Sequence, residues 1–328
     1  MKKLLLTAAI VLVLALAGCG TKEKASGEDS KNVTINIGIQ QSLGPLMLAQ
    51  NQKWFEKEFK KIGVNVKWTE FQSGPPQFEG LASGHLDFGQ VGNSPVISGQ
   101  GADIPFLEIA NSSDGLKGNA ILVGKNSKIK SVKDLKGKKI AVAKGSSGFN
   151  LLYRALDQNG LKPSDVKIIQ LQPDEAQPAF ENGSVDAWSI WEPFISLQNL
   201  KNEARILADG DSLKVASPGF TIVREGFAKD HPELVVKFLQ VYQKALEWQN
   251  EHFEESVDIL AKQKNLDKDV VRQVLKNNPA YNRPTSKEII AEQQRTADFQ
   301  QSLGVIKKKI DTGDVVDNSF IEKALKEK

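Results

Sequence analysis

The sequence predicts an α/β fold of two similar lobes, each an open sheet flanked by helices, with extra helices at the carboxyl end. From Val33 onward, short apolar strands alternate with helices, which is typical of βαβ units. Much of this pattern recurs about a hundred residues later, an offset of domain size. Gly84 and Asp87 lie where a helix ends and a strand follows, and Gly183 and Asp186 lie in a matching stretch. Because βα signals are generic, a chance likeness of two such units is the alternative.

The first residues predict export from the cytoplasm. Lys2 and Lys3 give a positive start, and the apolar run over residues 4–17 is too short to span a membrane. This arrangement is typical of a secretory signal peptide, which we expect over residues 1–18.

A lipid anchor is expected directly after the signal peptide. The sequence LAGC at residues 16–19 matches the lipobox of bacterial lipoproteins, which implies cleavage before Cys19 and attachment of acyl chains, palmitate among them, at that residue. Such chains hold a protein on a membrane without spanning it. A chance cysteine beside an ordinary cleavage site is the alternative. Residues 19–32 are then the lipidated cysteine and a flexible, charged tether.

The first lobe is predicted to begin at residues 33–116. Its strands alternate apolar and polar residues, and proline stands at helix starts, where its missing N–H costs nothing. We expect strands at 33–39, 64–71 and 86–88, and helices at 44–61, 75–84 and from 93 onward.

The second lobe is predicted over residues 117–212, and residues 213–328 return to the first lobe and add the carboxyl-terminal helices. Glycine-containing stretches at 115–118 and 210–219 are the expected crossovers. The remaining elements follow from the same signals. We expect strands at 119–123, 139–143, 166–171, 185–188 and 220–223, and helices at 147–160, 173–183, from 231, 254–264, 267–277, 286–303 and near the carboxyl terminus.

The composition is that of a soluble globular protein without a nucleic-acid partner. The chain is 40% hydrophobic and 25% charged, and its net charge of +3 moves towards zero once Lys2 and Lys3 leave with the signal peptide. Such a balance does not favour nucleic acid.

Nothing in the sequence predicts catalysis, a metal or a cofactor. His85, His231 and His252 lack metal-ligand spacing to one another or to a cysteine, and the nucleophile and nucleotide motifs are absent. Asp87 and Asp186, which we expect at the carboxyl ends of strands, are predicted to organise their own turns through backbone hydrogen bonds.

Short loops between a strand and a helix start recur at residues 40–44, 92–94 and 145–148, and they are rich in Ser, Asn, Gln and Gly. Helix starts present free N–H groups and the positive end of the helix dipole, so they bind anions without basic side chains. In an open α/β sheet these loops lie where ligands bind. A fully ionised sulfonate suits such neutral donors. The alternative is that Ser146 or Ser147 only caps a helix.

Three stretches resemble the solute-binding proteins of ABC importers for aliphatic sulfonates. They are KWTEFQSGPPQFEGLASGHLDFG (67–89), DLKGKKIAVAKGSS (134–147) and GSVDAWSIWEPF (183–194). The resemblance implies a type II periplasmic-binding-protein fold and a monomer that delivers a small organic anion to a membrane permease and its ATPase for sulfur acquisition. It places the protein on the outer face of the cell membrane or in the periplasm. Taurine, nitrate or a thiamine or pyrimidine precursor is the alternative ligand within the same group.

By position, the resemblance implies a ligand site composed of Gln41, Ser42, Asn93, Ser94, Gly145, Ser146, Ser147, Trp188, Trp191, Glu192 and Phe220. Many relatives carry Glu-Thr-Pro where this chain has residues 93–95, and loss of that acidic residue leans away from taurine. Core packing is the alternative for both tryptophans. Glu192 is alternatively a cap for the helix after Pro193 or a contact for the permease.

Two other classes of protein remain open. An enzyme on the same fold, such as a pyrimidine-precursor synthase, would need a reactive His or Lys in the cleft. A structural or adhesion lipoprotein would bind no anion at all.

Overall fold

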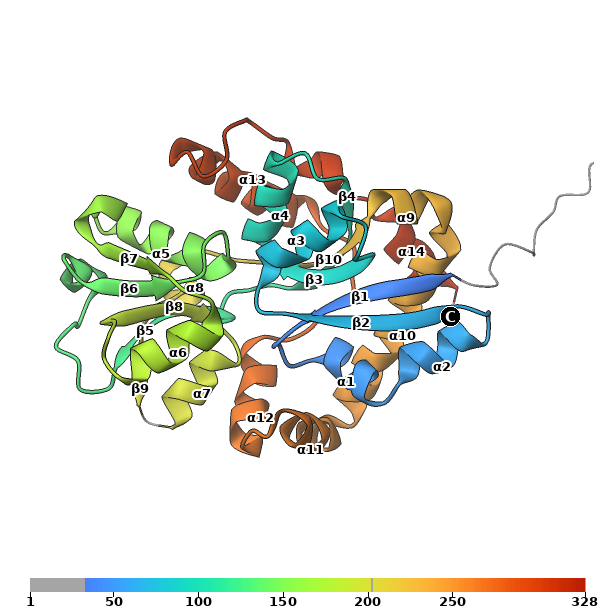
Figure 1. Cartoon of the computed structure of the whole chain (residues 1–328), viewed down its shortest axis with the longest axis horizontal. Helices are drawn as coiled ribbons and strands as arrows, with labels where there is room; N and C mark the ends of the chain where they lie inside the picture. Colours follow the sequence, from blue (N-terminus) through green and yellow to red (C-terminus); the bar gives the residue numbers. More distant parts are fainter. Residues whose placement is uncertain (1–32, 202, 328) are drawn as a thin grey trace, which may run out of the picture.

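The computed structural model describes residues 33–201 and 203–327. Over these residues the chain forms two lobes side by side, each with a five-stranded sheet between helices (Figure 1). The signal peptide, the lipidation site and the tether expected at residues 1–32 lie outside the described residues. Within the described ranges, no helix is long and apolar enough to cross a membrane.

The sheet of the first lobe has the strand order β2-β1-β3-β10-β4. Strands β1 to β4 come from the amino-terminal part of the chain, and β10 joins them after the second lobe is complete. The strands are β1 (Thr34–Gln40), β2 (Asn65–Phe71), β3 (Phe88–Gly92), β4 (Phe106–Ser113) and β10 (Gly219–Arg224).

The sheet of the second lobe has the order β7-β6-β8-β5-β9. Its strands are β5 (Asn119–Gly124), β6 (Lys139–Val142), β7 (Lys167–Gln170), β8 (Ala187–Trp191) and β9 (Ala204–Asp209). The two sheets share one topology, since each has three parallel strands followed by an antiparallel strand that arrives from the other lobe. That strand is β10 in the first sheet and β5 in the second. The predicted duplication is therefore a duplication of fold.

Helices cover both sheets, and the carboxyl-terminal ones return to the first lobe (Figure 1). Those between the strands are α1 (Pro45–Asn51), α2 (Trp54–Lys60), α3 (Gly74–Ala82), α4 (Asn93–Gly101), α5 (Ser147–Gln158), α6 (Pro173–Glu181), α7 (Phe194–Leu200) and α8 (Gly210–Leu213). Those after β10 are α9 (Glu225–Asp230), α10 (Pro232–Glu251), α11 (Phe253–Lys264), α12 (Lys268–Asn277), α13 (Lys287–Ser302) and α14 (Ser319–Lys326).

Each lobe has its own hydrophobic core. In the first lobe, α10 packs its apolar face on the sheet, and the rings of Phe88 and Phe238 stack with centroids 4.2 Å apart. The second sheet is covered on both faces, by α5 on the side of Ala187 and by α6 and α7 on the side of Trp188. Neighbouring residues of β8 thus enter different cores, as strand alternation requires.

The structure corrects several predicted elements. The single helix expected at 44–61 is two helices, because Lys53 has a left-handed φ of 56° and separates α1 from α2. The strands expected at 86–88 and 185–188 lie a few residues later, as β3 and β8. Strands β4 and β9 were not predicted. Both are edge strands, and their pairing with β10 and β5 depends on the crossovers rather than on local sequence.

Asp87 and Asp186 do not organise their own turns, and they precede strands rather than end them. The Oδ2 atom of Asp87 accepts a 2.9 Å hydrogen bond from the backbone N–H of Asn36, and that of Asp186 accepts a 2.8 Å bond from the N–H of Lys139. Each carboxylate therefore fastens its strand to the neighbouring parallel strand, at equivalent places in the two lobes. The prediction was wrong because strand adjacency cannot be read from local spacing.

Candidate functional site

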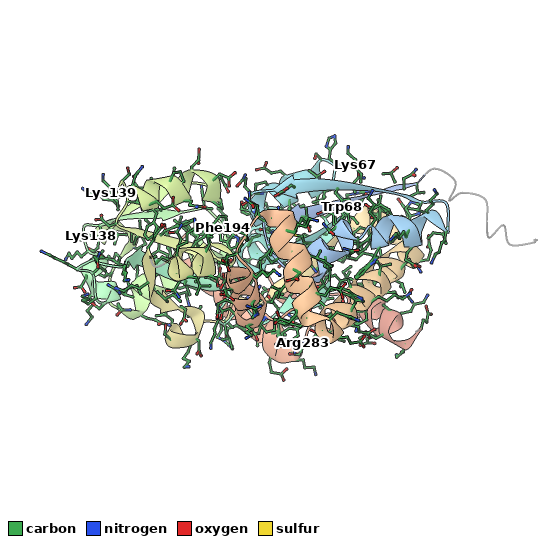
Figure 2. All side chains as sticks on the ribbon, turned by 90° about the horizontal axis from the view of Figure 1, so that it is seen from below. Lys67, Trp68, Lys138, Lys139, Phe194 and Arg283 are labelled. Carbon is green, nitrogen blue, oxygen red and sulfur yellow. The ribbon has the colours of Figure 1, made fainter. Side chains whose placement is uncertain are left out.

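A cleft of about 140 Å³ lies between the lobes. Its lining includes the carboxyl ends of β1, β3, β4 and β8 and the amino ends of the antiparallel strands β5 and β10. Figure 2 shows this orientation in the second lobe, where Lys138 and Lys139 lie at the outer end and Phe194, just past β8, lies toward the first lobe. This is the edge at which open α/β sheets bind ligands.

The lining is polar and almost uncharged. Its polar side chains are Gln40, Ser42, Gln90, Ser112, Ser113, Asn119, Ser146, Ser147, Glu192, Ser217, Tyr242 and Asn278. Glu192 is the charged residue in this set, and in the described part of the chain no lysine or arginine lines the cleft. The apolar part of the lining includes Leu43, Leu46, Met47, Val91, Pro95 and Trp191. An anion in this cleft would be held by neutral donors.

The start of α5 presents two serines with different roles. The Oγ atom of Ser146 accepts a 3.1 Å hydrogen bond from the N–H of Phe149 and donates a 2.7 Å bond to the carbonyl of Ala143. Its hydroxyl is therefore committed to capping the helix. The Oγ atom of Ser147 donates a 2.6 Å bond to Oδ1 of Asn119. Because Ser147 occupies the oxygen of that amide, the Nδ2 donors of Asn119 are left for another partner.

Two helix starts, one from each lobe, meet at the cleft. A Cβ atom on Gly92, at the start of α4, would lie 3.2 Å from Cβ of Ser147 at the start of α5. The first N–H groups of α5, on Ser147 and Gly148, have no partner within the helix. A Cβ on Gly148 would lie 2.9 Å from the carbonyl oxygen of Ser189, so only glycine lets this helix start approach β8 so closely.

Hydrogen bonds donated by two glutamine side chains fix the first-lobe wall of the cleft. The Nε2 atom of Gln40 donates to the carbonyl of Gln90 at 2.8 Å, and Nε2 of Gln90 donates to Oγ1 of Thr221 at 3.2 Å. Tyr242 lies behind them, and burial raises the pKa of its hydroxyl to about 12. The wall therefore stays neutral across the physiological range.

Glu192 lines the cleft, but other groups occupy its carboxylate. Its side chain accepts hydrogen bonds from the N–H of Ser196 at 3.0 Å, from the Ser196 hydroxyl at 2.8 Å and from Nδ2 of Asn277 at 2.8 Å. Burial raises the pKa of Glu192, and these donors act in the opposite direction. The alternative that Glu192 caps the helix after Pro193 is confirmed by the bond to Ser196, which lies in the first turn of α7.

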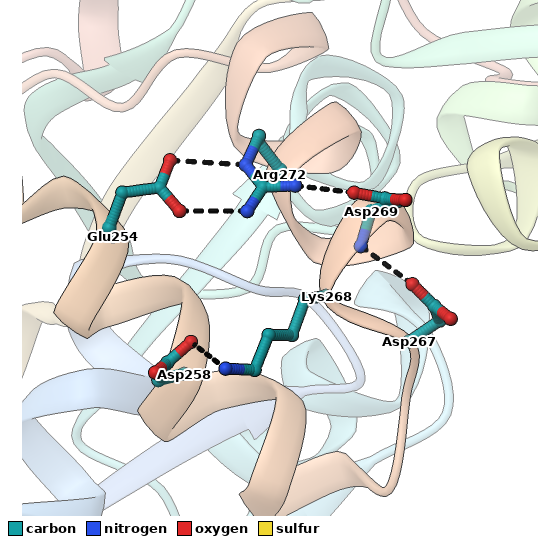
Figure 3. Close-up of polar contacts among 6 residues, drawn as sticks. All are labelled: Glu254, Asp258, Asp267, Lys268, Asp269 and Arg272. Carbon is teal, nitrogen blue, oxygen red and sulfur yellow. Dashed lines mark hydrogen bonds and ion pairs between the residues drawn. The ribbon is translucent and has the colours of Figure 1, made fainter.

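Helix α12 ends at Asn277, which contacts the second lobe. Ion pairs join α12 to α11 (Figure 3). Arg272 pairs with Glu254 at 2.7 Å and with Asp269, and Lys268 pairs with Asp258 at 2.6 Å. Asn278, the residue after α12, lines the cleft. The network thus supports a segment that touches both the cleft and α7.

The structure distributes the predicted site residues over four environments. Part of the set lines the cleft, namely Ser42, Ser146, Ser147, Trp191 and Glu192. Gln41 and Gly145 directly precede lining residues but do not belong to the lining. Asn93 and Ser94 are fully buried at the start of α4, between the lining residues Gly92 and Pro95.

Trp188 and Phe220 lie in the cores and outside the lining. Trp188 is fully buried between Phe180 and Phe194, with ring centroids at 5.9 and 5.4 Å, so the core-packing alternative describes it. Phe220 is fully buried in a cluster with Phe78 and Phe106. Neither side chain belongs to the cleft lining, because each packs into the core of its own lobe.

Several lining residues were not predicted from the sequence. Ser112 and Ser113 precede the predicted crossover at 115–118, and Ser217 lies within the one at 210–219. A crossover between two lobes necessarily borders the cleft between them. The predicted positions of the crossovers were therefore sufficient to place these serines beside the cleft. Asn278 follows α12, far along the chain, and no local signal marks it.

Known proteins resemble this chain over nearly its whole length. The family described as NMT1/THI5 like matches residues 40–256. A protein of Bacillus subtilis (strain 168) with a provisional assignment as an aliphatic sulfonates-binding protein is 60% identical over 327 residues, covering 100% of this chain and 98% of the relative.

Two solved structures share the fold and much of the sequence. The alkanesulfonate-binding protein SsuA from Xanthomonas axonopodis pv. citri, bound to MOPS, has a TM-score of 0.81 at 32% identity and covers 87% of this chain and 98% of its own. The periplasmic aliphatic sulphonate binding protein SsuA from Escherichia coli has a TM-score of 0.76 at 33% identity and covers 88% and 99%. This chain belongs to the NMT1/THI5-like family, in the periplasmic-binding-protein fold that these sulfonate-binding proteins adopt.

Proposed function

We propose that the protein is the extracytoplasmic substrate-binding protein of an ABC importer, which binds an aliphatic sulfonate and delivers it to a membrane permease and its ATPase for sulfur acquisition. The observation that carries this proposal is the cleft between the lobes, lined by neutral donors and two helix starts. The names of the relatives, which describe binding proteins for aliphatic sulfonates, support it. In this proposal the protein binds and releases its ligand without chemical change.

A sulfonate matches the chemistry of this lining. It is ionised at all physiological pH values and has three equivalent acceptor oxygens, so it needs donors and no proton transfer. The N–H groups of Ser147 and Gly148 and the Nδ2 atom of Asn119 are suitable donors, and the α5 dipole adds ~0.3–1 kcal/mol for an anion. The apolar residues Leu46 and Met47 suit a short hydrocarbon tail.

An ammonium group on the tail has no evident partner in the cleft. Glu192 is the carboxylate of the lining, and its oxygens already accept hydrogen bonds from Ser196 and Asn277. Asn93 is neutral and fully buried. We therefore expect an uncharged alkanesulfonate to bind more tightly than taurine.

Calorimetric titration tests the ligand class. The protein is titrated with alkanesulfonates of one to six carbons, with taurine, with nitrate and with an alkanecarboxylate of matched length. Binding of at least one alkanesulfonate, tighter than that of taurine and of the matched carboxylate, is expected. Preferential binding of nitrate or of a pyrimidine would overturn the sulfonate assignment, and no binding to any anion would favour a structural lipoprotein.

We further propose that the protein acts as a monomer, anchored by acyl chains on Cys19 to the outer face of the cell membrane. The lipobox at residues 16–19 supports this. Metabolic labelling with radioactive palmitate tests it. The label is expected on the parent protein and absent from Cys19→Ala, which should be released from the membrane. Equal labelling of both proteins would contradict the anchor.

A further inference from the structure

A carboxylate of the second lobe is held by two amides of the first lobe. The Oδ1 atom of Asp174, in the first turn of α6, accepts a hydrogen bond from Nε2 of Gln41 at 3.3 Å, and its Oδ2 atom accepts one from Nε2 of Gln72. The described contacts of Asp174 include no lysine or arginine. Each oxygen has its own partner, and both partners come from the other lobe.

The register of the first sheet places the two glutamines side by side. Gln41 directly follows β1 and Gln72 directly follows β2, and these parallel strands end in register, with Gln40 opposite Phe71. The register thus places two amide donors at the same edge of the first sheet. Asp174 is an acidic residue in the first turn of α6, where the helix dipole stabilises its charge.

The contact lies beside the cleft and is reversible. Gln41 is between Gln40 and Ser42, both of which line the cleft, so the bond to Asp174 ties a ligand-facing loop to the opposite lobe. Asp174 is exposed, while Gln41 and Gln72 are half-buried. Water can therefore replace these bonds at little cost when the lobes part, unlike the bonds of a buried pair.

We propose that Asp174, Gln41 and Gln72 form an interlobe latch that holds the closed form and sets the rate at which the ligand leaves. Gln41 then acts through Asp174 rather than by contact with the ligand. The latch proposal rests on the proposed function only in the choice of the ligand that is used to test it. It is a positioning device, because none of its three residues lies in the cleft lining.

Stopped-flow dissociation of 1-butanesulfonate, followed by tryptophan fluorescence, tests the latch. Asp174→Ala is expected to release the ligand about tenfold faster, equivalent to ~1.4 kcal/mol, with association changed by less than about twofold. Gln72→Ala removes one of the two bonds to Asp174 and should accelerate release less. The double variant should release the ligand no faster than Asp174→Ala, because Asp174→Ala already removes both bonds.

Glu175→Ala is the matched control. Glu175 is the next residue of α6, is also acidic and exposed, and accepts a 3.2 Å hydrogen bond from the N–H of Gln172 within its own lobe. Its loss should weaken the helix cap and leave ligand release unchanged. Release from Asp174→Ala at the parent rate, or equal acceleration in Glu175→Ala, would overturn the latch.

A variant that strengthens the contact with Asp174 provides a second test. Gln72→Lys places a cation opposite Asp174, so release should become slower than in the parent at low ionic strength, and the difference should vanish in high salt. The parent, which uses neutral donors, should show little dependence on salt. A salt-independent rate in Gln72→Lys would contradict the direct contact.

Small-angle X-ray scattering without ligand separates the latch from the proposed function. If no alkanesulfonate binds, the proposed function fails, whereas the latch still predicts a larger radius of gyration for Asp174→Ala than for Glu175→Ala. Equal radii in the two variants would count against the latch whatever the ligand is.

Discussion

The Nδ2 atom of Asn277, the last residue of α12, donates a 2.8 Å hydrogen bond to Oε1 of Glu192, which directly precedes Pro193 and α7. This bond joins a helix of the first lobe to a buried carboxylate of the second. Glu192 is 3% exposed and also holds Ser196, so the contact lies at the inner edge of the second lobe rather than at its surface.

Asn277→Ala should weaken ligand binding about tenfold, because the bond exists only when the lobes meet and hydrogen bonds to charged groups contribute ~1.5–3 kcal/mol. Isothermal titration with an alkanesulfonate measures the loss. Gln273→Ala is the control, since Gln273 bonds only the oxygen of the same amide, at 2.7 Å, and leaves its Nδ2 in place. Equal losses in both variants would mean that the orientation of α12, and not the bond to Glu192, matters.

Ser146→Ala and Ser147→Ala should separate stability from binding. Ser146 caps α5, so its loss should lower the free energy of unfolding by ~1 kcal/mol with a small effect on affinity. Ser147 faces the cleft and orients Asn119, so its loss should weaken binding about tenfold, equivalent to ~1.4 kcal/mol, with the fold intact. Thermal unfolding measures the loss of stability and calorimetry measures the loss of affinity for each variant. The double variant should show both losses, and the reverse assignment would contradict the roles given to the two hydroxyls.

Glu108 should make stability depend on pH. It is fully buried on β4 against Gln293 of α13, and burial raises its pKa from 4.5 to about 8. Between these values the unfolded chain loses the proton while the folded chain keeps it. The free energy of unfolding therefore falls as pH rises, by at most ~1.4 kcal/mol per pH unit, and levels off above about pH 8.

Thermal unfolding of the parent and of Glu108→Gln from pH 5 to pH 9 checks this slope. The variant has no proton to lose, so its advantage over the parent should grow with pH up to about 8. Glu79→Gln, at an exposed position of α3, serves as the control and should track the parent. A constant difference between Glu108→Gln and the parent would show that Glu108 ionises normally.

Gly115→Ala should destabilise the protein far more than the same substitution at an ordinary left-handed glycine. Gly115 has a φ of 68°, and a Cβ there would lie 1.7 Å from the carbonyl oxygen of Ser217, so the two crossovers would be forced apart. Gly137→Ala is the control, because its φ is 75° but nothing lies within 4 Å of its Cβ. We expect ~1–2 kcal/mol for Gly137→Ala and a larger loss, with loss of ligand binding, for Gly115→Ala. Equal losses in denaturant unfolding would contradict the steric argument.

Much of the fold could be predicted because its signals are local. Proline and serine at helix starts and apolar alternation in strands identified most elements of both lobes. The repeated Gly and Asp positions identified the duplication. The edge strands β4 and β9 escaped prediction, because their pairing partners arrive through the crossovers. The helix break at Lys53 escaped too, since a left-handed lysine carries no sequence signal.

The candidate site could be predicted only in outline. The loop at residues 145–148 could be identified as a candidate because a helix start with small hydroxyl residues can hold an anion without basic side chains. Both serines line the cleft, and the role of each depended on the partner that its hydroxyl finds, Phe149 for Ser146 and Asn119 for Ser147. Trp188 and Trp191 looked alike in sequence. Trp188 is fully buried in the second-lobe core, whereas Trp191, at the carboxyl end of β8, packs against that core and also lines the cleft.

The sequence by itself determined the two-lobed α/β fold and the donor-rich loops, because helix caps, strand alternation and loop composition act between neighbours in the chain. Only the tertiary structure decided which side chains meet across the lobes. Asp174 finds Gln72 across 102 residues and Gln41 across 133, and Asn277 finds Glu192 across 85. Such contacts depend on strand register and on the path of the crossovers, and these form only when the whole chain is folded.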